Sequence, residues 1–434
     1  MQDNAILGQF VLGHSPMISR DRQVVATRLT VFPEQRDGVP DAQALLRRLL
    51  DVWPAPDGAA EGSISLTLRS LGDVGGASAA ARPARPPSAD APTRATPLSL
   101  NVASEPWLKA LLAQAPPPHV MLEIPAFMAA DPSNAASLRS LSEAGSTLII
   151  KGRPVAELPR ELLPCFRHSL IDVGEERRSD ATPPPGVVRT ISHIQLGVRT
   201  RADVQAAFER GAVAVLGWPI DDAPAAAAAR QGGPDLQVVM ELIKRVDREE
   251  PIARLEQVLK NDPQLAFRLM RYLNSAAFGL SVEIASFQHA IMMLGYKKLK
   301  RWLALLLASS SKDPAMRPAM HAAVRRGLMM EELGRGNGDD EMRSEMFICG
   351  VFSLLDRMLG QPFDELLASV PVPERVRQAL VDGSGPYQPY LALVRAVEAG
   401  SRAEIRDKAD QTFLGLAEVN AALLRALASA RELD

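Results

Sequence analysis

The chain has 434 residues, of which 47% are hydrophobic, and it carries 49 Lys and Arg against 51 Asp and Glu. This length suggests about two or three domains. A net charge of -2 gives no global basic field, so we expect neither nucleic acid nor a membrane surface as a partner.

The cysteines and the apolar runs bear on location. Cys165 and Cys349 stand in the apolar settings Leu-Pro-Cys-Phe and Phe-Ile-Cys-Gly, and so few thiols in a long chain are typical of reduced core residues. The best apolar stretch, WLALLLAS from Trp302, is far short of the ~20 residues that cross a bilayer, and no basic leader precedes an apolar run at the start. We therefore expect a cytoplasmic protein with two reduced cysteines.

Strand-like and helix-like runs alternate through residues 1–220. The strand-like runs are QVVATRLTVF, SISLTLRSL, PLSLNV, HVMLEI, STLIIK and AVAVLGW, and the helix-like runs between several of them are LLRRLLDVW, ASLRSLSEAG and ADVQAAFERG. Strands that alternate with helices imply parallel βα units, and several such units in a row are typical of an α/β barrel of the TIM type.

Two segments of low complexity interrupt the chain. Residues 75–97, GGASAAARPARPPSADAPTRATP, are rich in Ala and Pro and have no period, which predicts a disordered insertion. Residues 221–234, DDAPAAAAARQGGP, separate two regions of different texture and predict a linker. We therefore place one domain at 1–220 and a second at 235–430.

Beyond the linker the pattern is helical nearly throughout. Asp262 can cap a helix that has Pro263 at its first position, and apolar residues follow at spacings of four, namely Leu265, Leu269 and Leu273. Ser286 can cap the next helix, FQHAIMMLG, which Gly295 ends. This part of the sequence predicts an all-α bundle of short helices.

The string NDPQLAFRLMRYLNSAAFGLSVEIASFQHAIMMLGYKKLKRWLALLLAS closely resembles the HDOD domain, an all-helical relative of HD-type phosphohydrolases found in bacterial signalling proteins. HD phosphohydrolases hold a metal through a His-Asp pair in a helix turn. Laid on GVFSLLDR, that turn puts Ser353 at the His and Leu354 at the Asp. Neither a lone hydroxyl nor a Leu can hold a divalent cation, so we expect GVFSLLDRML to be the inside of a helix kept for packing. Ser353 could bond back to a preceding carbonyl, which predicts that its replacement by Ala is nearly silent.

The first region resembles an EAL domain, the barrel-shaped cyclic di-GMP phosphodiesterase, in the degenerate form that precedes HDOD in EAL-and-HDOD signalling proteins. Its opening, FVLGHSPMISRDRQVVATRLTVF, looks like the family's Arg-Gln-Pro-Ile strand followed by the strand that bears the Glu of Glu-Ala-Leu. Active members bind two divalent cations through carboxylates and one Asn at the carboxyl ends of the barrel strands.

This resemblance implies that most of the metal ligands are gone. The signature Glu falls on Arg28, the first Asp of the Asp-Asp pair on Lys151, and a late Glu on Arg199, while Asn101 and Glu123 remain as oxygen ligands. A cation ~4 Å from a divalent ion costs roughly twice the ~4 kcal/mol of a unit-charge pair at an effective dielectric near 20. We therefore expect no metal, no cofactor and no catalytic residue. Other aligned positions carry Ser15, Gly152, Leu196 and Leu216, and Asp172 matches a further acidic position.

Two basic features admit two interpretations each. Arg28, Lys151, Arg153 and Arg199 could form a mouth that holds an anionic ligand without metal, with Asn101 and Glu123 beside it, because Arg suits phosphate oxygens. Scattered surface cations explain the same residues more simply. The run YKKLKRWL from Tyr296 could face nucleic acid or a membrane, but a solvated face over a packed Leu299, Trp302 and Leu303 stripe explains it as well.

Three functions remain. The leading hypothesis is a non-catalytic signal-transduction adaptor in cyclic di-GMP-linked regulation, which binds signalling proteins of unknown identity through a dead EAL barrel and a metal-less HDOD domain, as a monomer or a homo-oligomer. The alternative is a metal-independent receptor for cyclic di-GMP or another anion. An enzyme with residual phosphodiesterase activity would need carboxylates that the sequence lacks.

The linker hypothesis predicts the pattern of limited proteolysis. Residues 221–234 have neither a hydrophobic period nor a capping pattern, so a protease should cut the chain there and release a stable helical C-terminal fragment, identified by mass spectrometry and circular dichroism. A chain that resists cleavage in the linker and is cut first within residues 250 to 310 would contradict the boundary.

Overall fold

The computed structural model describes residues 6–34, 41–54, 97–153, 158–177, 191–222, 234–252, 254–255, 258, 287–308, 313–337, 339–369 and 372–431. The chain divides into two compact units, Met1–Pro219 and Ile220–Asp434. Apart from Pro97, the expected insertion lies outside the described residues, as do most of the expected linker, the strand SISLTLRSL and the helix expected to begin at Asp262.

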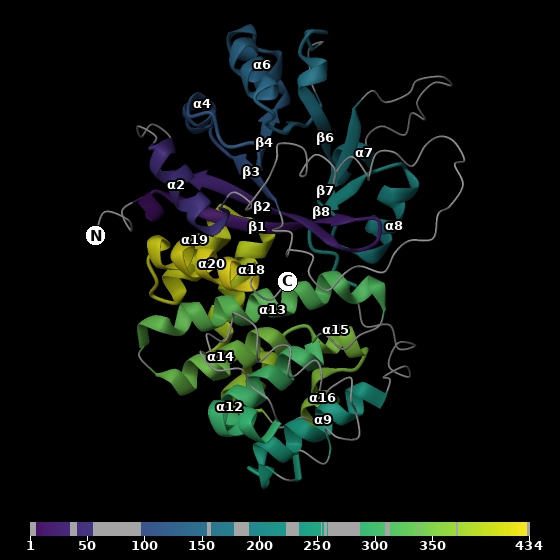
Figure 1. Cartoon of the computed structure of the whole chain (residues 1–434), viewed down its shortest axis with the longest axis vertical. Coiled ribbons are helices and arrows are strands. Elements are labelled where there is room, and N and C mark those ends of the chain that lie inside the picture. The colour runs from purple at the N-terminus through teal and green to yellow at the C-terminus, as the bar shows by residue number, and fades with distance from the viewer. Residues whose placement is uncertain are drawn as a thin grey trace. The chain divides into compact units, whose positions relative to one another are not determined.

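The first unit is a closed barrel of eight strands that follow one another in chain order (Figure 1). The strands are β1 (Phe10–Ser19), β2 (Val24–Pro33), β3 (Leu98–Val102), β4 (Val120–Pro125), β5 (Leu148–Lys151), β6 (Phe166–Asp172), β7 (Ser192–Leu196) and β8 (Ala214–Leu216). Strand β1 pairs antiparallel with both β2 and β8, and the other neighbours are parallel. The predicted α/β barrel is therefore confirmed, although its first strand runs against the others.

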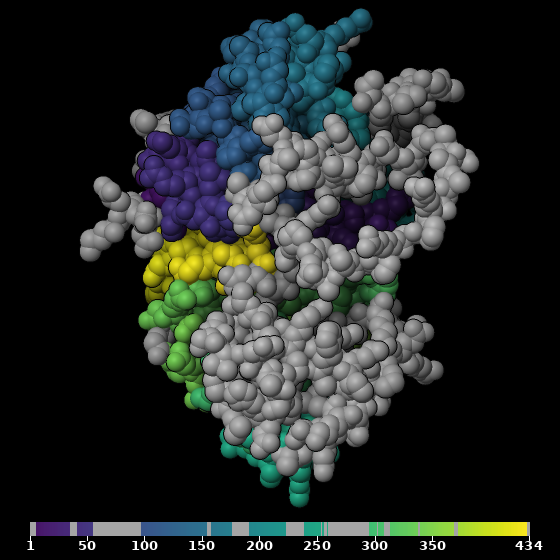
Figure 2. All heavy atoms as spheres, in the orientation of Figure 1, coloured from purple at the N-terminus to yellow at the C-terminus, as the bar shows by residue number. Residues whose placement is uncertain are grey.

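The helices of this unit are α2 (Ala42–Val52), α4 (Glu105–Ala113), α5 (Ala126–Ala130), α6 (Ala135–Glu143), α7 (Val173–Arg177) and α8 (Arg201–Glu209). Helix α2 begins where the Asp41 side chain accepts the N–H of Ala44, and it buries Leu45, Leu46 and Leu49. Helix α8 begins with a reciprocal capping box between Thr200 and Asp203. Atoms of α2, α4 and α6 form much of the visible surface of this unit (Figure 2, purple to blue).

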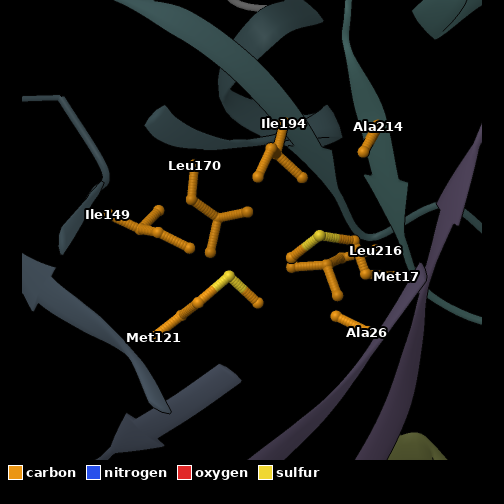
Figure 3. Packing of buried hydrophobic residues seen from close by; sticks show 8 residues of the cluster. All are labelled: Met17, Ala26, Met121, Ile149, Leu170, Ile194, Ala214 and Leu216. Atoms are coloured by element: carbon orange, nitrogen blue, oxygen red, sulfur yellow. The ribbon is translucent and has the colours of Figure 1, made fainter. Parts of the chain in front are cut away.

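An apolar layer fills the barrel interior (Figure 3). It consists of Met17, Ala26, Met121, Ile149, Leu170, Ile194, Ala214 and Leu216. Strand side chains alternate between two faces, so the residues two positions further along three of these strands also face the interior, nearer the carboxyl ends. Those residues are Arg28, Glu123 and Lys151. The fold thus places charged side chains in a layer directly above an apolar plug.

The second unit is helical. Its α-helices are α9 (Pro234–Asp247), α12 (Phe287–Ala308), α13 (Arg317–Leu333), α14 (Asp340–Phe352), α15 (Leu355–Leu359), α16 (Phe363–Ser369), α17 (Glu374–Arg377), α18 (Gln388–Ala399), α19 (Arg402–Gln411) and α20 (Leu416–Arg431). Gly295 is non-helical inside α12, at φ 71°, where the sequence predicted a helix end. Within the described residues no single helix has the length and apolarity to cross a membrane, while α19 and α20 meet that test only when joined across their 105° bend.

Helices α13 and α14 cross with their backbones in contact. A Cβ on Gly350 would lie 2.5 Å from the carbonyl oxygen of Arg326 and 2.6 Å from the nitrogen of Gly327. Only glycine permits such an approach at this crossing. The contact brings the side chain of Arg326 beside the C-terminal end of α14.

The stretch GVFSLLDRML is not one continuous helix. Helix α14 ends at Phe352 and α15 begins at Leu355, with Leu354 at φ -127° and ψ 8° between them. The expected burial is confirmed, because Ser353 and Leu354 are 3% and 2% exposed. An apolar run alone cannot reveal a break of this kind, since both short helices bury most of their faces.

The barrel contains a buried histidine with a predictable effect on stability. Burial, assisted by the charge of Arg167, lowers the pKa of His168 to about 4, and its Nδ1 lies 2.8 Å from Ser192 Oγ. Because the folded pKa lies below the ordinary value of about 6.5, the unfolded state binds more protons between these values, and stability falls as the pH falls from about 6.5 to 4.

Between pH 7 and pH 5, urea titrations should show a loss of roughly 2 kcal/mol that the His168→Gln variant lacks. The difference between the two proteins isolates this side chain from the other groups that titrate. Equal slopes in the wild type and the variant would contradict the assignment.

Candidate functional site

The charged layer of the barrel is centred on a buried ion pair. Arg28 on β2 donates from Nε to Glu123 Oε1 and from Nη2 to Oε2, both at 2.7 Å, and Ser99 on β3 donates to Oε1 at 3.1 Å. Arg28 is 9% exposed and Glu123 is fully buried. This bidentate geometry is the strongest form of the Arg–carboxylate interaction. Both oxygens of Glu123 are therefore occupied by protein donors.

A second contact lies next to this pair. Lys151, at the end of β5, donates to Asn101 Oδ1 at 2.9 Å, and the Asn101 amide donates to Thr30 Oγ1 at 3.3 Å. Burial is the main cause that lowers the pKa of Lys151; the charge of Arg28 lowers it too, against the opposing charges of Glu123 and Glu175. The side-chain oxygen of Asn101, which could have been a metal ligand, instead accepts a hydrogen bond from the ammonium group of Lys151.

These residues do not fit a divalent metal. Hard cations need several free oxygen ligands, but Arg28 holds the carboxylate of Glu123 and Lys151 holds the amide oxygen of Asn101. The two cations would also repel a metal. Within the described ranges no group of three or more His, Cys, Asp or Glu side chains could hold an ion.

The structure brings Arg28, Glu123, Asn101 and Lys151 together in the barrel interior, whereas Arg199 is exposed after β7. Arg28, Glu123, Asn101 and Lys151 form one connected layer. Arg199 is exposed on the turn between β7 and α8, where its backbone N–H donates to Asp203 at 3.2 Å. Arg153 is also exposed. Of the postulated basic mouth, Arg28 is thus neutralised by Glu123, and Lys151 lies beside this pair.

The helical unit contains a second buried ion pair of the same kind. Arg326 on α13 donates from Nε and Nη2 to the carboxylate of Glu398 on α18 at 2.7 to 3.0 Å, and the two side chains are 5% and 9% exposed. Its Nη1 donates to Ser353 Oγ at 3.1 Å, and Ser353 donates to the Gly350 carbonyl at 2.7 Å. Ser353, the residue aligned with a metal-binding His, therefore accepts a hydrogen bond from Arg326.

The groups around this second pair suit packing rather than chemistry. Burial raises the pKa of the Cys349 thiol to about 12, so it stays protonated and unreactive. Burial also raises the pKa of Asp356, and the N–H of Arg357 opposes that change. Cys165 and Cys349 are both free, as expected.

The basic run YKKLKRWL is partly used inside the helical unit. Lys300 pairs with Asp247, and Arg301 pairs with Glu331 and stacks over the ring of Phe347, 4.0 Å from its centroid. Leu299 and Leu303 are buried. The contacts favour the expected packed stripe over a free basic strip.

Sequence reasoning missed four members of the two networks, namely Thr30, Ser99, Arg326 and Glu398. The last two carry a usable signal, because each is a charge inside a mostly apolar stretch of helix, MHAAVRRGLMM and QPYLALVRAVEA, in which Arg325 and Arg395 are the further arginines. Charges in such positions are almost never fully buried unless paired. The partner in each case is not readable from spacing, because the two residues of each pair are far apart in the chain.

Comparison with known proteins identifies part of the helical unit. Residues 234–359 match the HDOD domain. The chain carries an HDOD domain. Among curated relatives, the uncharacterized protein YuxH of Bacillus subtilis (strain 168) is 32% identical over 168 residues, which are 37% of this chain and 40% of that protein. Cyclic di-GMP phosphodiesterase CdgJ of Vibrio cholerae is 28% identical over 172 residues, 39% of each. The chain thus spans about two fifths of the length of the curated relatives it matches.

Solved structures similar to the chain include two EAL-related proteins. The PaMucR phosphodiesterase in complex with c-di-GMP is 14% identical with a TM-score of 0.29, over 51% of this chain and 94% of that one. The EAL domain of Mycobacterium smegmatis DcpA is 15% identical with a TM-score of 0.27, over 49% and 92%. Likeness at this level carries no argument about activity, and the barrel assignment rests on the strand pairing.

The buried pair in the barrel predicts strong coupling between its two members. Glu123→Leu leaves Arg28 buried without a counter-charge and next to Lys151, and should cost ~3 to 5 kcal/mol. Arg28→Met should cost a similar amount, whereas the double variant Arg28→Met/Glu123→Leu should be close to the wild type in stability. Urea denaturation of the four proteins measures the cycle, with Glu105→Gln as the surface control, which should change stability little. Additive losses would contradict a direct pair.

The second pair revises the expected effect of Ser353. Removing its hydroxyl leaves a buried N–H of Arg326 without an acceptor, so Ser353→Ala should cost ~1 to 3 kcal/mol rather than being silent. Leu354→Ala should cost ~2 to 5 kcal/mol through lost burial and a residual cavity. Thermal melts with and without EDTA should show no metal dependence in either variant or in the wild type. A wild-type melting temperature that EDTA lowers, and that Ser353→Ala makes insensitive, would establish a metal site here.

Proposed function

We propose that this chain is a non-catalytic signal-transduction adaptor in cyclic di-GMP-linked regulation. In this proposal a degenerate EAL barrel, residues 1–220, and an HDOD domain, residues 235–430, are joined by the linker and offer surfaces to other signalling proteins in the cytoplasm. The relationship to a protein named as a cyclic di-GMP phosphodiesterase supports the regulatory setting.

One observation supports the non-catalytic part above all others. In the barrel a buried arginine, Arg28, stands at the position aligned with the signature Glu, and in the helical unit a second buried arginine, Arg326, bonds to Ser353, the position aligned with a metal-binding His. Metal-assisted hydrolysis needs an activated water held by such ligands. Of the aligned oxygen ligands, Glu123 and Asn101 are bonded to internal cations, and Asp172 accepts the N–H of Gly174 at 2.7 Å. The remaining role for two well-packed units is recognition.

A metal-independent receptor for cyclic di-GMP or another anion is the second candidate. Lys151 favours it, because this partly buried ammonium directs one hydrogen bond to Asn101 and its other donors are without a partner among the described residues. The charge of Glu175 acts on Lys151 as well, and it weakens the local positive field. The adaptor therefore stands first.

Calorimetric titration with cyclic di-GMP and a hydrolysis assay with Mg²⁺ or Mn²⁺ test both candidates. The adaptor predicts no turnover with either metal and no binding that depends on metal. Binding without metal that Lys151→Met abolishes and the surface control Lys109→Met retains would establish the receptor. Metal-dependent turnover that Glu123→Ala removes would overturn the non-catalytic proposal.

A further inference from the structure

Helix α19 ends at a residue that is unusual for its position. Phe413 follows the C-cap Thr412 with φ 56°, a left-handed conformation that strains a residue with a Cβ and that glycine usually occupies. Four other helices of this unit are followed by left-handed residues, of which Gly360, Gly383 and Gly400 are glycines and Glu249, after α9, is at φ 50°. Phe413 is the hydrophobic residue among the described helix ends of this kind.

The backbone around Phe413 is held by a complete set of hydrogen bonds. Its N–H donates to the Asp410 carbonyl at 3.1 Å, the N–H of Leu414 donates to the Ala409 carbonyl at 3.1 Å, and the Thr412 hydroxyl donates to the same carbonyl at 2.9 Å. The first two are the paired bonds of a Schellman motif. The turn therefore fixes where the aromatic ring projects.

The ring gains nothing from burial. Phe413 is 96% exposed, and Phe127, at 62%, is the other large exposed hydrophobic residue among the described ones. Burial of apolar surface is the main favourable term in folding, and Phe413 contributes none of it. Neither backbone preference nor packing within the chain accounts for phenylalanine here, and strained residues of this kind concentrate at functional sites.

Exposed acidic side chains flank this turn along the chain. Asp407, Asp410 and Glu418 are all exposed. Lys408 pairs with Asp407 at 3.0 Å, whereas Asp410 and Glu418 form no ion pair within the described part of the chain, and Glu418 accepts the N–H of Gly415 at 2.8 Å. Residues 410–418 therefore carry two acidic side chains and no basic one, and this segment is the negative rim of the turn; the exposed Arg406 lies one turn earlier on α19.

We propose that Phe413 is the anchor of a protein-binding surface whose partner offers an apolar pocket rimmed by Lys or Arg. This inference rests on the proposed adaptor function and names the surface that would carry it. An aromatic anchor that fills a pocket supplies a large share of the binding energy at protein interfaces, and charge complementarity around it speeds association. The negative rim disfavours the other apolar occupant, an anionic bilayer.

The partner is found by cross-linking from the position itself. The photoreactive residue p-benzoylphenylalanine replaces Phe413 in the full-length chain in its native host, and the matched control places it at Phe127. Mass spectrometry identifies the cross-linked protein. That protein is then purified, and its Kd for the wild-type chain, without the photoreactive residue, is measured. We expect a protein cross-linked from position 413 and absent from position 127.

Variants then separate recognition from folding. Phe413→Gly should raise the melting temperature, because it relieves the left-handed strain, and should weaken the Kd for that partner at least tenfold. Phe127→Ala should leave the Kd unchanged. Asp410→Asn should lower the association rate and reduce its dependence on salt.

Each contrary outcome bears on a different claim. A partner that is cross-linked only from position 127, or whose Kd is unchanged by Phe413→Gly, would overturn this surface and leave the adaptor function standing. Sedimentation with vesicles of phosphatidylglycerol and phosphatidylethanolamine that depends on Phe413 would replace the protein partner by a membrane. No cross-linked protein from any surface position would overturn both this inference and the proposed function.

Discussion

Two buried arginines are each held by a carboxylate from a distant part of the chain. These two ion pairs determine which buried polar groups remain available to a ligand. Arg28 and Glu123 join strands β2 and β4, and Arg326 and Glu398 join helices α13 and α18. A buried charge is costly unless it is paired and fully hydrogen-bonded. Once such a pair is in place, each partner is committed to the other and is unavailable to a ligand.

The backbone makes these pairs possible in two different ways. In the barrel, the two-residue period of the strands puts the charged layer one step above the apolar plug, so water is excluded from below. In the helical unit, the contact at Gly327 and Gly350 brings α13 and α14 close enough for Arg326 to reach Ser353. The ion pair in the barrel therefore depends on the apolar layer beneath it. The ion pair in the helical unit depends on two glycines, which let the helix backbones approach.

Much of this architecture could be predicted from the sequence. The strands rich in Val, Ile and Leu, such as STLIIK and HVMLEI, were identified because their composition signals a buried strand. Strands β6, FRHSLID, and β7, SHIQL, were not identified, because a polar residue, His168 or His193, occupies a buried position in each and shortens the apolar pattern. The antiparallel start of the barrel also has no local signal, since the direction of β1 is set by its partners.

The candidate site was predictable in its members and not in its pairing. Arg28, Asn101, Glu123 and Lys151 could be singled out by alignment with family positions, but which cation meets which oxygen depends on barrel geometry. The break between α14 and α15 was hidden for a related reason. In a run such as GVFSLLDRML the apolar residues cover more than one helix face. The run therefore shows no clear hydrophobic period from which a change of helix direction could be deduced.

The bidentate pair in the barrel also constrains how this sequence can change over time. A metal centre at this place would require an acidic residue in place of Arg28 and another in place of Lys151, together with the Glu123 that is already there. Changing Arg28 first places two buried carboxylates side by side with no metal ligand set complete, and changing Lys151 first leaves Glu123 still locked to Arg28. Neither single substitution gives a complete set of metal ligands, so a metal centre here would need both changes together. Surface positions of the barrel carry no such constraint and can change one at a time.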